Sequence, residues 1–129
     1  MNDQVQTELK RIFNGRFSTS ESTRANYARG EDTYDPILSK AVVFPETNEE
    51  VSQILTLCNK HKIPVVPFGT GTSLEGNVVG NDKGITISLE KMNKILSVSP
   101  EDFDCRVQAC VTKEQLNDYL REDGVFFPI

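Results

Sequence analysis

Apolar and polar positions along the chain follow two different periods, and these periods predict its helices and strands. At the start, the apolar spacing predicts a helix over residues 3–13 that ends near Gly15. The apolar face of this helix consists of Val5, Leu9, Ile12 and Phe13. Residues 14–40 are polar and rich in turn-forming types, so they predict a loop with one short helical turn.

The pattern becomes more regular from residue 41. Residues 41–45 form a short apolar run that ends at a proline, which predicts a buried strand. A helix is expected over residues 48–61, with Val51, Ile54, Leu55 and Cys58 at helical spacing. Its start has the form of a capping box, in which Thr47 accepts from the Glu50 N–H and Glu50 reaches back.

The rest of the chain predicts further strands and one more helix. Residues 63–68 predict a strand that forms a right-handed βαβ unit with the first strand. Further strands are expected over residues 85–89, 94–99 and 104–111. A second capping box, Thr112 to Gln115, begins a helix that ends at Gly124. From residue 41 the order is β-α-β-β-β-β-α, which indicates an α+β fold with a mixed sheet.

The last residues, 125–129, form an apolar stretch that resembles the start of another strand. Natural termini are usually solvated and mobile, so we expect the chain to be the N-terminal fragment of a longer protein.

The net charge, the cysteines and the lengths of the apolar runs indicate which partners and which cellular compartment to expect. The formal net charge is −5, which argues against nucleic acid or an anionic membrane surface as the main partner. The three cysteines, Cys58, Cys105 and Cys110, form no CxxC pair, so reduced thiols in an intracellular protein are expected. We find neither a secretory signal nor an apolar run of the ~18 residues that a membrane span needs. These features predict a cytoplasmic protein, with peripheral association at the inner face of a membrane as an alternative.

A glycine-rich segment follows the strand predicted at residues 63–68. Its glycines allow the backbone to approach a ligand, and consecutive N–H groups then form a concave site for phosphate oxygens. Hydroxyl side chains in the segment supply further donors. The segment reads Val65-Val66-Pro67-Phe68-Gly69-Thr70-Gly71-Thr72-Ser73-Leu74-Glu75-Gly76-Asn77. From composition alone, a tight glycine turn between two strands remains an equal alternative.

Two familiar phosphate-binding motifs do not fit this segment. A dinucleotide-binding G-x-G-x-x-G fits at Gly69 and Gly71, but Leu74 holds the third position. A Walker A loop fits at Gly71 and Gly76, but Asn77 replaces the lysine. The segment therefore belongs to another class of loop.

Residues 41–128 resemble the FAD-binding domain of the vanillyl-alcohol oxidase type, also called the PCMH type. Residues 41–45 with Glu50-Val51 are similar to the family's first strand and helix, and residues 67–76 to its pyrophosphate loop. Phe126-Phe127-Pro128 is similar to the approach to the next flavin-contacting segment. Within the family, the sequence of the loop most resembles those of cytochrome-linked D-lactate dehydrogenases and the FAD subunit of glycolate oxidase.

The resemblance implies two α+β subdomains with FAD between them. This chain would supply an N-terminal helix and arm (1–40) and the first part of the FAD-binding domain (41–129). The backbone amides expected at the pyrophosphate are those of Gly69, Thr70, Gly71, Thr72, Ser73 and Leu74. Pro67 and Phe68 would line the wall beside it, and Gly76 and Asn77 would lie at the far end of the loop. The loop has no histidine or cysteine, so non-covalent FAD is expected.

The implied reaction is oxidation of a D-2-hydroxy acid, D-lactate above all, with a cytochrome or quinone as electron acceptor. The family places its base, and often a metal, in a later substrate domain. We therefore assign no catalytic and no metal-binding residue to this chain.

Several other residues are of chemical types that could contribute to a site. At Cys110 the family usually has glycine, so a side chain there would crowd the flavin side of the strand at 104–111 or simply pack. His61 is expected at the end of its helix, where a cation suits the helix dipole. An acidic turn at residues 101–104 is expected to be a solvated loop. Surface packing is favoured over approach to the flavin for three residues of the arm: Arg24, Tyr27 and Arg29.

Two rival functions stay open. One is a stand-alone nucleotide-binding or regulatory module that uses the same loop without turnover. The other is a different flavin oxidase of the same superfamily. The isolated chain is expected to bind FAD weakly, and its exposed apolar edge to favour self-association.

Overall fold

A computed structural model describes residues 3–30, 34–72 and 76–128 of the chain. The chain folds into two compact units, Met1–Lys91 and Met92–Ile129. Among the described residues, no helix is long and apolar enough to cross a membrane.

The first unit contains a four-stranded mixed sheet. Its strands are β1 (Phe17–Ser18), β2 (Ala41–Val43), β3 (Val65–Phe68) and β4 (Ile85–Ser88), in the order β1-β2-β4-β3. β4 runs parallel to both β2 and β3, whereas β1 pairs antiparallel with β2. The mixed α+β architecture is as predicted.

The two strands of the expected βαβ unit lie parallel in one sheet, although they do not pair directly. β2 and β3 are parallel but not neighbours, because β4 lies between them. All four residues of β4 are buried, and a strand buried on both faces belongs at the centre of a sheet. In this central position both edges of β4 are hydrogen-bonded to neighbouring strands.

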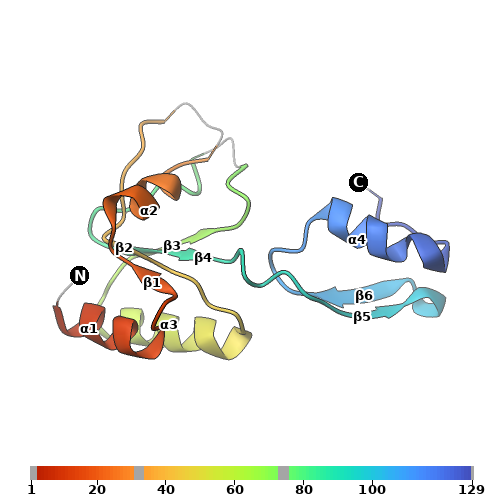
Figure 1. The fold of residues 1–129 in the computed structure, drawn as a ribbon, viewed down its shortest axis with the longest axis horizontal. Helices are drawn as coiled ribbons and strands as arrows, with labels where there is room; N and C mark the ends of the chain where they lie inside the picture. The colour runs from red at the N-terminus through yellow and green to blue at the C-terminus, as the bar shows by residue number, and fades with distance from the viewer. Residues whose placement is uncertain (1–2, 31–33, 73–75, 129) are drawn as a thin grey trace. The chain divides into compact units, whose positions relative to one another are not determined.

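Two helices, α1 (Asp3–Ile12) and α3 (Asn48–Lys60), lie side by side on one face of this sheet (Figure 1). They bury Val5, Leu9, Ile54 and Cys58 of the apolar positions that the sequence predicted, whereas Ile12 and Val51 are half-buried and Leu55 is exposed. The core consists of Val5, Leu9, Phe13, Ile54 and Cys58 from the helices, with Ala41, Val43, Ile85 and Ile87 from the sheet. Burial raises the pKa of the Cys58 thiol to about 11, which fits its role in packing.

The opposite face of β4 is polar, and Ser39 of the arm contacts it. The Ser39 and Thr86 hydroxyl oxygens lie 2.8 Å apart and are buried, and the Asn81 N–H donates to Ser39 Oγ at 3.0 Å. The alternation of Ile85, Thr86, Ile87 and Ser88 thus separates an apolar face from a hydrogen-bonded one.

The arm contains more regular structure than predicted. Its one expected helical turn is α2 (Glu21–Asn26), which Ser20 caps by accepting from the Thr23 N–H. The strand β1 was missed, because two residues are too few to show a period. The Phe44 N–H donates to the Arg16 carbonyl at 2.9 Å and extends this pairing.

The capping box at the start of α3 is partly confirmed. Thr47 Oγ1 accepts from the Glu50 N–H at 3.2 Å, as predicted. The Glu50 carboxylate accepts from the Glu46 N–H and from the two terminal nitrogens of Arg16, at 2.8 and 2.6 Å. The bonds from Arg16 lower the pKa of Glu50 to about 2, against an opposing effect of burial.

Replacing Glu50 by glutamine is expected to lower the free energy of unfolding by about 1–2 kcal/mol at pH 7, because a partly buried bidentate pair is lost. The folded-state pKa of Glu50 lies below its ordinary value of 4.5. The pair's contribution is therefore complete above that ordinary value and lost as the pH falls towards 2. Urea unfolding at pH 7 and near pH 2.5 measures the effect, with Glu8→Gln, in an exposed pair with Arg11, as control. An equal loss at both pH values would contradict the assignment.

The second unit is a β-hairpin with one helix. β5 (Ile95–Ser99) and β6 (Asp104–Val107) pair antiparallel, and a short 3-10 helix (Pro100–Asp102) joins them in the acidic, solvated turn that was expected. α4 (Lys113–Leu120) begins at Thr112, which accepts from the Gln115 N–H, and a further 3-10 turn ends at Gly124 with φ +71°. From Ala41, the predicted element order is confirmed.

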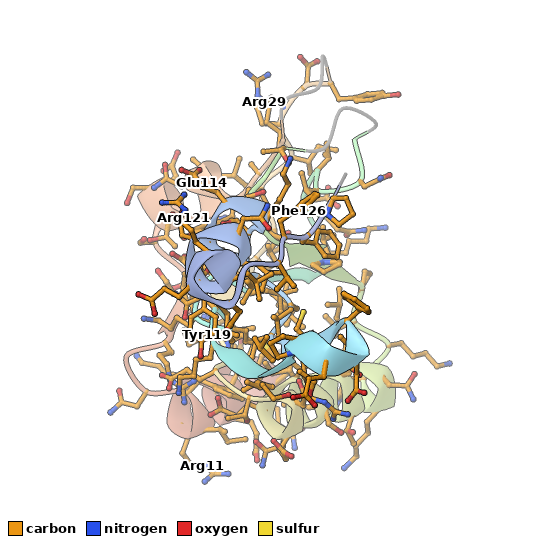
Figure 2. The ribbon with its side chains drawn as sticks, turned by 90° about the vertical axis from the view of Figure 1, so that its right-hand side faces the viewer. Arg11, Arg29, Glu114, Tyr119, Arg121 and Phe126 are labelled. Carbon is orange, nitrogen blue, oxygen red and sulfur yellow. The ribbon has the colours of Figure 1, made fainter. Side chains whose placement is uncertain are left out.

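Two expectations for the second unit were wrong. The strand expected over residues 104–111 ends at Val107, and Cys110 lies in the following turn, where its N–H donates to the Met92 carbonyl. Cys110 therefore does not sit in a strand. Residues 125–128 form no strand either, because the Asn117 side chain bonds both the N–H and the carbonyl of Phe127. Figure 2 shows Phe126 and Tyr119 at different sides of α4, and both are exposed.

Candidate functional site

The carboxyl ends of three parallel strands meet at one edge of the first unit's sheet. Phe44 follows β2, Gly69 follows β3 and Leu89 follows β4. The Leu89 N–H donates to the Phe68 carbonyl at 2.9 Å, which ties two of these ends together. Ligands of open sheets with parallel strands bind beyond this edge, so it is the first place to seek a site.

The glycine-rich loop leaves the sheet at this edge, and its two first glycines differ. Gly71 has φ +75°, and a Cβ there would lie 2.5 Å from Phe68 Cζ. The backbone conformation and the Phe68 ring therefore require glycine at residue 71, whether or not a ligand is bound. A Cβ on Gly69 would meet no atom of the described residues within 4 Å. The space beside Gly69 is open, and a ligand can reach the backbone there.

Backbone donors of the loop have no partners in the described part of the chain. No hydrogen bond between described residues uses the N–H of Gly69, Thr70, Gly71 or Thr72. These four residues follow β3, which is the edge strand of the sheet, and belong to no strand themselves. The two threonine hydroxyls are exposed and lie 3.4 Å apart. This group of amides and hydroxyls suits an anion with several oxygens.

The remaining predicted residues fall in different places. Phe68 is buried beneath the loop, whereas Pro67 is exposed on β3. Ser73 and Leu74 lie outside the described residues. Gly76 has φ +77° with the Tyr34 ring against it, and Asn77 is exposed.

An aromatic cluster beside the loop joins Phe68, which was predicted as part of the site, to Tyr27 and Phe44, which were not. The Tyr27 ring lies edge-on to two other rings, with centroid distances of 5.6 Å to Phe44 and 5.1 Å to Phe68. The Tyr27 hydroxyl donates to the Glu90 carboxylate. Burial, and then this bond, raises the pKa of Tyr27 to about 12, so the hydroxyl stays protonated at neutral pH. No local pattern predicts this arrangement, because the three rings and Glu90 come from four separate segments.

The other groups that the sequence singled out have structural roles. Arg24 Nε donates to the Thr19 carbonyl at 3.0 Å, and Arg29 donates to the Tyr34 carbonyl at 3.4 Å. His61 caps the end of α3. Within residues 3–30, 34–72 and 76–128, no three histidine, cysteine or carboxylate side chains gather as a metal site would require.

Comparisons with known proteins agree on one family. A sequence profile described as the FAD binding domain matches residues 39–129. A protein named "Probable D-lactate dehydrogenase, mitochondrial" from Danio rerio is 39% identical over 112 residues, which cover 87% of this chain and 22% of that protein. A protein named "D-lactate dehydrogenase [cytochrome], mitochondrial" from Arabidopsis thaliana is 34% identical over 125 residues, which cover 95% of this chain and 22% of that protein.

Among solved structures, an alkyldihydroxyacetonephosphate synthase superposes with a TM-score of 0.87 at 20% identity and covers 98% of this chain and 26% of its own. This likeness concerns the fold. The chain thus spans about a fifth of the length of the curated relatives it matches. The profile match, together with these relatives, shows that the chain belongs to the FAD binding domain family, in the PCMH-type fold that the resemblance implied.

Proposed function

We propose that the chain supplies the pyrophosphate-binding part of an FAD-dependent dehydrogenase. In this proposal, residues 1–40 are an N-terminal helix and arm, and residues 41–129 are the first part of the FAD-binding domain. The second subdomain and a substrate domain belong to the rest of the longer protein. The residues proposed to contact FAD are Pro67, Phe68, Gly69, Thr70, Gly71, Thr72, Ser73, Leu74, Gly76 and Asn77.

One observation carries this proposal: backbone donors without partners among the described residues lie beside open space at the carboxyl-end edge of the sheet. The space beside Gly69 is what a Cβ would fill, and the amides of Gly69 to Thr72 have no partner among the described residues. Several amide dipoles can share the charge of a pyrophosphate without a cationic side chain. The residues present therefore fit the phosphate portion of FAD.

When bound, FAD would take a hydride equivalent from the substrate. The part of this chain is to hold and orient the cofactor's phosphates, and no proton-transfer role falls to its described residues. Residues 65–80 contain neither histidine nor cysteine, so the proposed binding is non-covalent. Acid precipitation of the loaded protein should release the flavin into the supernatant, and flavin that stays with the pellet would refute this point.

The proposed substrate is a D-2-hydroxy acid, D-lactate first, and the proposed acceptor is a cytochrome or quinone. Support comes from the names of the zebrafish and Arabidopsis relatives. The complete reading frame that contains this chain should give a yellow protein that bleaches without oxygen when D-lactate is added. Reduction by L-lactate alone would reject the assignment.

The isolated chain should bind FAD weakly, because contacts from the proposed second subdomain are missing. A gel-filtered sample should be colourless. Stoichiometric flavin on the isolated chain would instead show that this part suffices. The exposed Phe126 and Phe127 favour self-association, which sedimentation at several concentrations would measure.

Two alternatives predict other outcomes of the bleaching test. A nucleotide-binding module without turnover would hold FAD, and no hydroxy acid would reduce it. Another flavin oxidase of the superfamily would be bleached by a different substrate.

The proposed compartment is the cytoplasm or the inner face of a membrane. Because both relatives are named as mitochondrial, fractionation of the source cells is the direct test.

A further inference from the structure

A continuous series of contacts links the N-terminal arm to the loop. Glu90 accepts from the Tyr27 hydroxyl, the Tyr27 ring packs edge-on against Phe68, and the Phe68 ring lies directly beneath Gly71. Phe44 packs against another part of the Tyr27 ring at 5.6 Å, with an interplanar angle of 76°. Tyr27 is thus the only one of these side chains that comes from the arm.

The position of Phe68 sets the position of Gly71. The Gly71 backbone, at φ +75°, approaches the ring so closely that a Cβ would overlap Phe68 Cζ and Cε1, at 2.5 and 2.9 Å. A shift or rotation of this ring therefore moves the backbone above it, or leaves a void that the loop can enter. The same backbone carries the amides proposed to bind the pyrophosphate.

The orientation of the Tyr27 ring is fixed at two ends. Its backbone N–H closes α2 by donating to the Ala25 carbonyl, and its hydroxyl is held by Glu90. Glu90 is held in turn by Ser88, because the Glu90 N–H donates to Ser88 Oγ at 3.4 Å and Ser88 Oγ donates to the carboxylate at 3.3 Å. Since Ser88 ends β4, the central strand anchors the series.

We infer that Tyr27 is a positioning residue that, through its contacts with Phe68 and Glu90, holds the Gly69–Thr72 backbone in its anion-binding conformation. This inference rests on the proposed function of the loop. It gives the N-terminal arm a role in cofactor binding, although no residue of the arm needs to touch the cofactor.

The test compares Tyr27→Phe and Tyr27→Ala in the 129-residue chain, with Tyr119→Phe and Tyr119→Ala as matched controls. Tyr119 lies exposed on α4, in the other unit (Figure 2). Amide resonances of Gly69, Thr70 and Gly71 are recorded by NMR without ligand and during titration with FAD. Urea unfolding of each variant gives its stability separately.

Tyr27→Ala should shift these amide resonances without ligand and weaken FAD binding about tenfold, because two edge-to-face contacts are lost. Tyr27→Phe keeps the rings and should weaken binding only about threefold, through loss of one hydrogen bond. Glu90→Ala should match Tyr27→Phe, and the double variant should be no weaker than either. The Tyr119 variants should leave both readouts unchanged.

A Tyr27→Ala chain whose ligand-free amides match those of the parent overturns the inference, even if its stability falls. Additive losses in the double variant would also overturn it, because the hydroxyl would then act independently of Glu90. If FAD perturbs none of the loop amides in the parent chain, the proposed function fails. In that case the ligand-free spectra still decide whether Tyr27 positions the loop.

Discussion

Replacing Gly71 by alanine is expected to weaken FAD binding at least tenfold (roughly 1.4 kcal/mol or more), and the cause is the ring beneath it. The added Cβ would lie 2.5 Å from Phe68 Cζ, and the φ of +75° is itself unfavourable for alanine. Phe68 cannot rotate freely out of the way, because it is buried and the Tyr27 ring packs against it. The loop must therefore move, and its amides move with it. Flavin fluorescence titration of the longer protein, or amide NMR of this chain, measures the loss.

Two companion variants separate backbone strain from ligand contact. Gly15→Ala carries the same strain at φ +80° but meets no atom within 4 Å, so it should leave FAD binding unchanged. In Gly69→Ala the added methyl group meets no atom of the described residues, and the backbone is not left-handed, so the free energy of unfolding should stay within about 0.5 kcal/mol of the parent value. The substitution should nevertheless weaken FAD binding, because its methyl group occupies the proposed ligand space. If Gly69→Ala binds FAD as tightly as the parent chain, FAD does not occupy the space beside Gly69.

Replacing Gly80 by alanine is expected to lower the free energy of unfolding by about 3 kcal/mol, at the upper end of ordinary overpacking. The added Cβ would lie 2.0 Å from the Ile37 carbonyl oxygen and 2.9 Å from the Ser39 nitrogen. Both are backbone atoms, so no side-chain rotation relieves the overlap. The Gly80 N–H also donates to the Ala28 carbonyl at 3.0 Å, and a shift would break this bond. Urea denaturation of the chain gives the value.

Gly124→Ala is the matched control for Gly80→Ala. Gly124 has φ +71° and open space around it. Its replacement should therefore lower the free energy of unfolding by only about 1 kcal/mol, the cost of a left-handed backbone for alanine. A loss at Gly80 no larger than at Gly124 would mean that residues 37–39 do not pack against the end of the loop. A larger loss would show that the arm is part of the folded unit that carries the site.

Local signals in the sequence were sufficient for most of the elements. Helix periodicity and caps predicted α1, α3 and α4, because side chains three and four residues apart share a face and a cap involves neighbours. The glycine-rich sequence at residues 67–76 was sufficient to indicate the family, since it lies in one continuous stretch. The element order from residue 41 followed from the same local patterns.

The tertiary structure decided what depends on distant residues. It placed β4 between β2 and β3, where both edges of the strand are hydrogen-bonded to a neighbouring strand. It formed β1, whose two residues have no periodic signal and pair only because β2 offers an edge. It also brought Tyr27 to Phe44, Phe68 and Glu90. Sequence alone determined the segments and the loop, whereas packing between segments far apart in the chain determined how the loop is held.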